Sequence, residues 1–219
     1  MRGASLKYVW LTTRRELVWF PGAMFAVLVL IMWMMRRPDI RFAIAKGYLG
    51  FLVPLMTGIM AAYAVLDDPA LELRFATPVS AARTLLGRLV LILGVQTVFA
   101  LVFQVCALAM GVRFAPLGSA SAVQLAWIIP TLSLAAVGAS GALAAAQCAT
   151  GAFLAAAVWL VQLLMKSWLI ANASSVYLFM GMLEPKHPDL LWSQGVLVVA
   201  SLVLMTLSWV LLHRQERYL

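Results

Sequence analysis

The sequence predicts an all-α integral membrane protein with six transmembrane helices, and three observations carry this prediction. The chain has 219 residues, of which 64% are hydrophobic and only 11% are charged. A soluble domain is about half apolar, so it has no room to bury this much apolar surface. The apolar residues also form long runs separated by short polar segments, and a helix needs roughly 20 such residues to cross a bilayer.

Six apolar runs have a length that suits a membrane crossing. We expect the six helices at residues 18–35, 43–66, 86–111, 123–147, 151–170 and 194–212. Trp19 and Trp33 lie near the ends of the first run, where aromatic rings favour the membrane interface. Pro54 lies inside the second run and should kink that helix, because proline lacks the N–H that an α-helix uses. The very short, uncharged link between the fourth and fifth runs predicts a tight antiparallel hairpin.

The two ends of the chain are basic. Residues 1–17 mix basic and apolar side chains, which is typical either of an amphipathic helix at the membrane interface or of a solvated basic leader. No small-residue cleavage site follows a short apolar stretch, so we expect no cleaved signal peptide. Residues 213–219 form a short polar tail.

The net charge of +8 comes from basic residues scattered near the ends of the apolar runs. This pattern fits contact with anionic lipid headgroups, whereas nucleic-acid binding would need the charges on one soluble face. Six crossings place both termini on one side of the membrane. Nine of the 16 basic residues then lie on the side of the termini and seven lie on the other, which favours termini inside the cell. Cys106 and Cys148 fall within apolar runs and are expected to be small core residues.

The longest polar interruption lies at residues 67–85, between the second and third runs. It contains two helix-start signals, Asp68-Pro69 and Thr77-Pro78, in which an oxygen-bearing side chain precedes proline at the first helical position. We therefore expect a short helix at about residues 69–76 and a second helix that begins at Pro78 and continues into the third crossing.

Few polar side chains within the apolar runs suggest chemistry. Lys166 is the charged residue inside a run, and it either extends to the interface or lines a translocation path with Gln162 one turn away. Gln96, Thr97 and Gln104 in the third run pose a similar choice between a path and a helix seam. No carboxylate lies inside a run, so transport driven by ion coupling has little support and the energy would come from elsewhere.

Two further segments leave alternatives open. Small and polar residues recur along residues 123–147, including Ser133, Gly138 and Ser140, and they indicate either close helix packing or a polar wall. Residues 171–193 form a longer polar loop, expected outside the cell, in which residues 177–183 are apolar and are expected to form an interfacial or re-entrant helix.

The polar interruption resembles the loop between the second and third crossings of ABC-2 type exporter permeases. Three sequence features carry the resemblance: an acidic start at Asp67-Asp68, the run Leu71-Glu72-Leu73, and the turn Ala76-Thr77-Pro78-Val79-Ser80 followed by Leu85-Leu86-Gly87-Arg88. Pro69-Ala70 departs from the Gly-Thr that this family often has there. The length, the six runs and the ends of the chain agree with the resemblance.

The resemblance implies a transport function. It implies an amphipathic elbow helix at residues 1–17, cytoplasmic termini in the plasma (inner) membrane, and a cytoplasmic coupling loop that contacts a separate ATPase subunit. The coupling-loop contacts would be Asp67, Asp68, Glu72, Arg74, Phe75 and Arg83. ATP and Mg²⁺ would bind to the ATPase, so this chain would hold no cofactor, no metal and no catalytic residue, and nucleic acid is not among its implied partners.

A second permease, identical or related, would complete the transporter within the lipid bilayer. The short chain is also similar to the haem-exporter permease of cytochrome c maturation, which is an alternative within the same class. A secondary carrier or channel acting alone, and a membrane scaffold without transport, are alternatives from other classes.

Overall fold

A computed structural model describes residues 16–66 and 81–213 of the chain. Within these ranges the chain forms helices and no strand. In chain order the elements are α2 (Glu16–Met34), α3 (Pro38–Gly47), the π-helix η1 (Tyr48–Leu52), α4 (Val53–Leu66), α6 (Ala81–Ala109), the 3₁₀-helix η2 (Ala115–Leu117), α7 (Ala120–Ala145), α8 (Cys148–Leu164), α9 (Lys166–Asn172), the 3₁₀-helix η3 (Ser174–Val176), α10 (Met180–Leu183) and α11 (Leu190–His213).

Four helical stretches in the described residues are long and apolar enough to cross a membrane. They are Pro38–Ala64, Leu86–Ala109, Ala120–Ala145 and Leu190–Leu211. A fifth is present if α8 and α9 count as one bent crossing, and α2 contributes a shorter apolar helix at Trp19–Met34. The length and composition of these helices indicate a multi-pass helical membrane protein.

The outside of the bundle is apolar, as a lipid-facing surface requires. Phe153 is 74% exposed, Leu191 is 79% exposed and Trp192 is 69% exposed, although each would be costly to leave in water. Only 17% of the apolar stretch of α11 is buried, against 67% for α7. The core therefore lies around α7, and the other helices turn one face outward.

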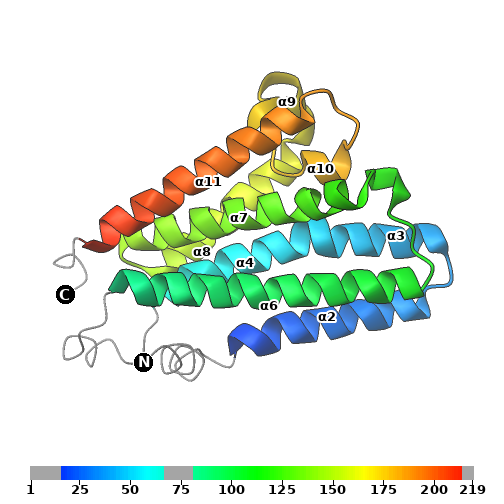
Figure 1. Ribbon diagram of the computed structural model, residues 1–219, viewed down its shortest axis with the longest axis horizontal. Helices are drawn as coiled ribbons and strands as arrows, with labels where there is room; N and C mark the ends of the chain where they lie inside the picture. The colour runs from blue at the N-terminus through cyan, green and yellow to red at the C-terminus, as the bar shows by residue number, and fades with distance from the viewer. Residues whose placement is uncertain (1–15, 67–80, 214–219) are drawn as a thin grey trace.

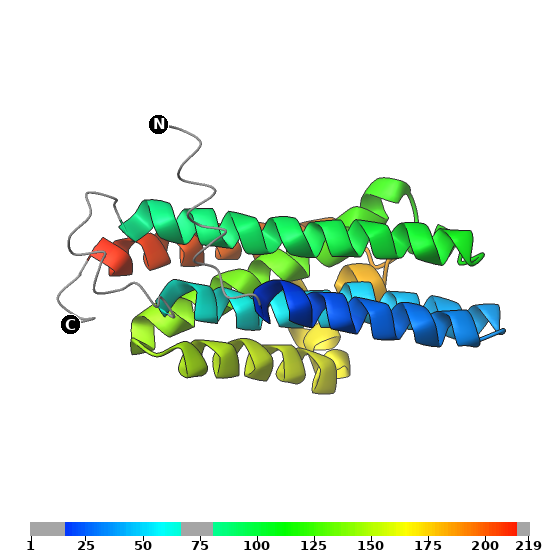
Figure 2. The ribbon, with the colours of Figure 1, turned by 90° about the horizontal axis from the view of Figure 1, so that it is seen from below.

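Helix α7 packs against α4, α8 and α11, while α2 packs against α6 (Figure 1). Seen from below, α6 and α8 lie on opposite sides of the bundle (Figure 2). The first described turn of α2 and the last turn of α11 lie toward the same end of the molecule, which we call the terminal end. The α2–α3 and α6–α7 connections define the distal end.

Glycines bring α4, α7 and α8 into close contact. A Cβ at Gly138 would collide with the carbonyl oxygen of Gly58, and a Cβ at Gly151 would lie 2.5 Å from the backbone nitrogen of Ala142. Small residues let helix backbones approach in this way when there is no hydrophobic drive from water. Of the two interpretations of the small residues in residues 123–147, the structure supports close packing. The expected tight hairpin is also present, because Ala146 adopts a left-handed φ of 52° between α7 and α8.

Arg41 joins three helices at the distal end. Its Nε donates to Met32 O at 3.2 Å, and its Nη1 donates to Met110 O at 2.7 Å. These carbonyls lie at the C-terminal ends of α2 and α6, where helices leave backbone oxygens without partners and where a positive charge is favourable.

Several helices differ in extent from the sequence prediction. The second helical stretch begins at Pro38, not at residue 43, because Pro38 occupies the first helical position after an extended Arg37. Likewise α11 begins at Leu190, within the predicted 171–193 loop. The predicted elbow helix lies outside the described residues up to position 15, as do residues 67–80 of the coupling loop and residues 214–219 of the tail.

Candidate functional site

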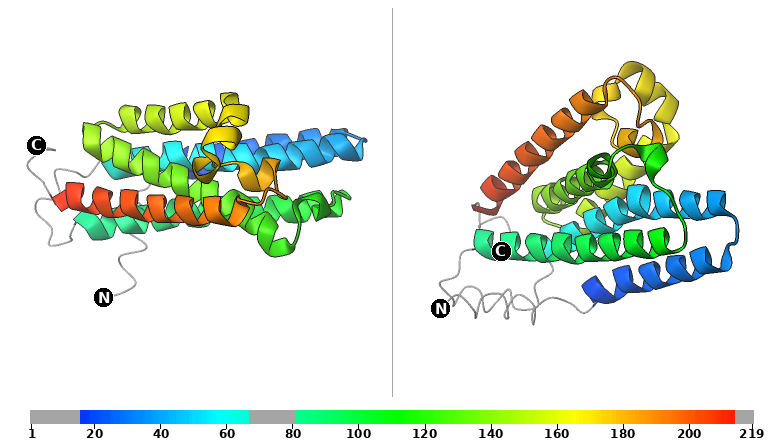
Figure 3. Two further views of the ribbon diagram at one scale, coloured as in Figure 1. Left: turned by 90° about the horizontal axis from the view of Figure 1, so that it is seen from above. Right: turned by 45° about the vertical axis from the view of Figure 1, so that its right-hand side comes forward.

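The predicted fifth crossing at residues 151–170 is not a straight helix. Helix α8 ends at Leu164, and α9 leaves it at an angle of 81°, with Met165 at φ −96° and ψ 23° between them. The chain therefore turns sharply across the bundle instead of continuing along it (Figure 3). Neither proline nor glycine marks the bend, so the local sequence did not predict it.

After the bend the chain folds back into the bundle. We call residues 173–189 the return segment. Its apolar stretch is buried: Tyr177 and Phe179 are 0% exposed and Met182 is 0% exposed. Tyr177 and Phe179 pack with Ile129 of α7 and with residues of α11. Residues 177–183 therefore pack into the bundle, and both the interfacial and the re-entrant position relative to the membrane stay predictions.

Gln162 fixes the return segment to α8. Its Nε2 donates to Val176 O at 3.1 Å, and its Oε1 accepts from Leu178 N at 3.1 Å. One side-chain amide thus satisfies a backbone donor and a backbone acceptor that the fold buries without a secondary-structure partner. This pairing explains why an otherwise apolar helix carries a glutamine that is 9% exposed.

Lys166 forms a second link between the bend and the return segment. Its Nζ donates to Glu184 Oε1 at 2.9 Å, and both side chains are partly exposed. This hydrogen bond and the charge of Lys166 lower the pKa of Glu184 below its ordinary value. Burial, with a smaller effect of the Glu184 charge, raises the pKa of Tyr177 to about 12, so its hydroxyl stays neutral.

The return segment lies against a π-helical turn. In η1 the backbone N–H of Val53 reaches the carbonyl of Tyr48, five residues earlier. Pro54 follows directly and has no N–H to donate to the preceding turn, which accounts for a local change of bonding. Trp159 Nε1 of α8 donates to the carbonyl oxygen of Phe51 at 2.9 Å. The structure thus places a π-turn directly before Pro54, within a helical stretch that runs from Pro38 to Ala64.

Gly50 provides the contact surface of this turn. A Cβ at Gly50 would lie 2.6 Å from Met182 Cγ, so α10 approaches the backbone of η1 directly. The ring of Phe51 meets the ring of Phe179 edge-on, with centroids 4.9 Å apart. The π-turn, the bend and the return segment therefore form one packed unit, which is the candidate functional site.

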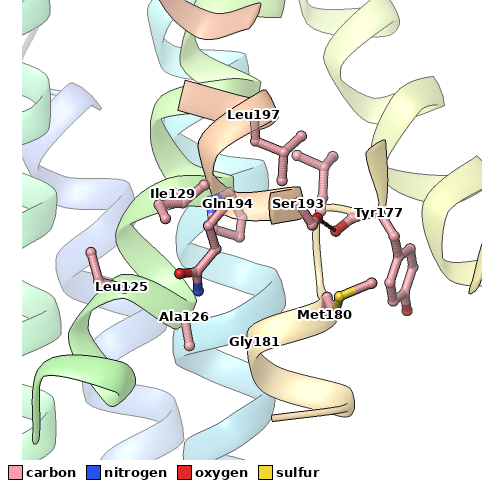
Figure 4. Close-up of a pocket in the computed structure, with 11 residues that line it drawn as sticks. Leu125, Ala126, Ile129, Tyr177, Met180, Gly181, Ser193, Gln194 and Leu197 are labelled. Carbon is pink, nitrogen blue, oxygen red and sulfur yellow. Dashed lines mark hydrogen bonds between the residues drawn. The ribbon is translucent and has the colours of Figure 1, made fainter. Parts of the chain in front are cut away.

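The cavity beneath the return segment is small. It measures about 10 Å³ and lies between α7, the return segment and α11, where Ser193 Oγ donates to Tyr177 O at 3.4 Å (Figure 4). This volume admits about one water molecule. A larger molecule would pass between these elements only after the return segment moves.

The structure brings together two of the five predicted path residues. Gln162 and Lys166 both bond to the return segment, whereas Gln96, Thr97 and Gln104 lie on α6, and the two glutamines bond to other helices. Gln96 Nε2 lies 3.1 Å from Met60 Sδ of α4, and Thr97 is half-buried.

Gln104 belongs to a separate hydrogen-bonded cluster with α7. Gln124 Nε2 donates to Gln104 Oε1 at 2.7 Å, and Trp127 Nε1 donates to Gln124 Oε1 at 2.8 Å. Sequence reasoning missed Glu184 and Trp159 as members of the site. The sequence did contain one indication of the Lys166–Glu184 pair, because Lys166 is isolated in an apolar run and the carboxylate of Glu184 ends the next apolar stretch.

The predicted ATPase contacts Asp67, Asp68, Glu72, Arg74 and Phe75 lie outside the described residues. Arg83 lies in the first turns of α6. Residues 67–80 connect α4 with α6, and these two helices pack side by side. Among the described residues, no three His, Cys, Asp or Glu side chains are placed to hold a metal ion. Comparison of the chain with protein-family models, curated proteins and solved structures finds no match.

Proposed function

We propose that this chain is the transmembrane permease subunit of an ABC-2 type exporter, which moves a substrate with energy from ATP hydrolysed on a separate ATPase subunit. The observation that carries the proposal is the loop sequence from Asp67 to Leu89, with its acidic start and its Thr77-Pro78 turn. The packing of α4 beside α6 supports it, because a partner bound at this loop would act on two neighbouring helices at once.

The distribution of charge also supports an external energy source. In the described candidate crossings, the only carboxylate is Asp39, which lies at the first turn of its helix. Carriers that couple to protons or ions commonly place ionisable groups deep in the membrane. A partner that hydrolyses ATP supplies the energy without such groups.

In this proposal the chain crosses the membrane six times, through α2, α3–α4, α6, α7, α8–α9 and α11. At about 1.5 Å per residue, the 19 residues of α2 extend about 28 Å, close to the hydrocarbon thickness. Both termini and the 67–85 loop lie in the cytoplasm, and the distal end faces outward. A second permease subunit, identical or related, pairs with the chain in the inner membrane.

The return segment acts as the outer barrier in this proposal. The π-turn is part of the same continuous helix that ends at Leu66, next to the loop. A displacement of that loop would therefore move Gly50 against Met182 and shift α10. Opening of the Gln162 and Lys166 links would then release the return segment.

Site-directed cross-linking tests the partner contact. Cysteine at Phe75, in a chain with both native cysteines replaced by alanine, should capture an ATPase subunit in native membranes. Cysteine at Ala115, which is exposed in the α6–α7 connection, is the matched control and should capture none. Absence of capture at Phe75, while a positive control within the ATPase dimer cross-links, would refute the contact.

Reconstitution separates the proposal from its alternatives. The proposal expects substrate movement only with the ATPase and ATP. Movement by the purified permease alone would indicate a carrier or channel, and ATPase stimulation without movement would indicate a scaffold.

A further inference from the structure

A hydrogen bond joins the two ends of the return segment. Ser174 Oγ, in η3, donates to Oδ2 of Asp189, which directly precedes α11, at 2.9 Å. The backbone of Asp189 also begins α11, because Ser193 N donates to Asp189 O at 2.8 Å. The Ser174–Asp189 bond, which we call the base bond, therefore holds the start of the return segment against the first turn of α11.

His187 contacts the backbone of Asp189 in a way that depends on its protonation state. Its Nδ1 accepts a hydrogen bond from Asp189 N at 3.2 Å. A ring nitrogen accepts a hydrogen bond only when it carries no proton, so this contact requires the neutral imidazole with its proton on Nε2. Neutral His187 thus holds the backbone of Asp189 while the carboxylate of Asp189 stays bonded to Ser174.

Protonation of His187 reverses this contact. Nδ1 of the imidazolium is a donor, so it can no longer accept from Asp189 N. The carboxylate of Asp189 lies nearby, with Oδ2 3.9 Å from Nδ1. A charged donor binds a carboxylate more strongly than a neutral hydroxyl does. The imidazolium therefore competes with Ser174 for the same oxygen atom.

The neighbouring charges separate a response of His187 from that of the other carboxylate in the loop. In the described part of the chain, the charged groups beside His187 are Asp189, Glu184 and the exposed Lys186, and Lys166 of α9 is bonded to Glu184. Lys166 lowers the pKa of Glu184 below its ordinary value of 4.5, and His187 adds to this effect. Histidine side chains change charge between about pH 5 and pH 8, where Glu184 stays ionised.

We propose that His187 is a pH-sensitive switch of the return segment: neutral His187 leaves Asp189 bonded to Ser174, whereas protonated His187 takes the Asp189 carboxylate and opens the base bond. The side chain of His187 is 24% exposed, so it can exchange a proton with the solvent. The switch itself does not depend on the proposed export function. Its consequence for transport does, because the 171–193 loop then lies outside the cell and external acid loosens the outer barrier.

Nuclear magnetic resonance tests the protonation state of the ring, because the chain has two histidines. The purified full chain, labelled with nitrogen-15 in the histidine rings, is measured in detergent at about pH 8 and about pH 5.5. His213→Gln, at the last residue of α11, leaves the signals of His187 alone. At the higher pH the neutral ring of His187 should carry its proton on Nε2. A neutral ring that carries its proton on Nδ1 would overturn the proposal.

Hydrogen exchange tests the effect on the base bond. Protection of residues 174–189, measured relative to the intrinsic exchange rate at each pH, should fall about fivefold between about pH 8 and about pH 5.5 in the wild type. His187→Asn places an amide oxygen near the position of Nδ1 and takes up no proton in this range. This variant should therefore keep the same protection at both pH values. His213→Gln is the matched control and should retain the full response.

Ser174→Ala removes the bond that protonation of His187 should open. It should lower protection at about pH 8 by about fivefold and leave little further response to acid. The proposal would be overturned by the absence of a response in the wild type or by an equal response in His187→Asn. Loss of the response in His213→Gln, or a full response in Ser174→Ala, would overturn it as well.

Discussion

Gly50 and Met182 are separated by 132 residues in the sequence, yet a single methyl group at Gly50 would lie 2.6 Å from Met182 Cγ. The contact joins the π-turn of one helix to the segment that returns from the bend in another. The side chain of Met182 is flexible and can absorb part of the overlap. A side chain at Gly50 would therefore shift α10 and would not prevent folding. Substitutions at Gly50 therefore test whether the return segment packs against the π-turn.

Gly50→Val should destabilise the protein by about 1–3 kcal/mol, because it overpacks the contact with Met182. Gly94→Val is the control, since a Cβ at Gly94 meets nothing within 4 Å and the cost of valine in a helix is the same. Thermal unfolding in detergent measures both. Adding Met182→Ala to Gly50→Val should recover most of the loss, and equal shifts for the two glycine variants would contradict the contact.

Gly138→Ala should be more harmful than Gly50→Ala, although both add one methyl group. The new Cβ at Gly138 collides with the backbone carbonyl of Gly58, which cannot rotate away, so α4 and α7 must separate. We expect a loss of about 3 kcal/mol or more. Gly195→Ala, where a Cβ has open space, serves as the control in the same unfolding assay. A loss at Gly138 no larger than at Gly50 would show that the helices can move apart freely.

The helices could be predicted from the sequence because each is a local property. An apolar run of about 20 residues implies a helix in lipid, and prolines and polar segments mark where runs end. The bend at Met165 could not be predicted, because no residue at that position breaks a helix. Glu184 lies 18 residues after Lys166, and only the fold shows that the two side chains meet beside the bend.

The candidate site was predictable only in part, for a related reason. Gln162 and Lys166 were identified because polar side chains are conspicuous in an apolar run. Gln96 and Gln104 were equally conspicuous, but they bond to α4 and α7, and the sequence holds no sign of that difference.

Gln162→Leu should loosen the return segment. It removes a buried acceptor for Leu178 N and a buried donor for Val176 O, and each unsatisfied group costs about 1–3 kcal/mol. Hydrogen exchange at Leu178 should therefore speed up about 10-fold or more. Gln147→Leu, at an exposed position, should leave this exchange unchanged. Unchanged protection at Leu178 in Gln162→Leu would refute the role assigned to this glutamine.

Acid should weaken the link between α9 and the return segment. The folded state lowers the pKa of Glu184 from its ordinary value of 4.5, so the stabilising effect is complete above that value and is lost as the pH falls through the lowered pKa. Protection of residues 174–189 from hydrogen exchange, measured relative to the intrinsic exchange rate at each pH, should therefore fall in the wild type as the pH drops below 4.5.

The glutamine side chain of Glu184→Gln cannot ionise. Residues 174–189 of this variant should therefore be less protected from hydrogen exchange at neutral pH, and their protection should change less in acid. Asp39→Asn, which removes the exposed partner of Arg37, is the matched control and should retain the acid response of the return segment. An acid response in Glu184→Gln equal to that of the wild type would assign the effect to another group.

The π-turn at Tyr48–Leu52 determines the rotational phase of everything before it in its helix. A π-turn holds one residue more than an α-turn, and one residue corresponds to about 100° around a helix axis. Deleting a residue from this turn would rotate α3 by that angle relative to α4. Arg41 would then leave the carbonyl ends of α2 and α6. One extra residue in the helix thus directs the Arg41 guanidinium toward the backbone of the two neighbouring helices.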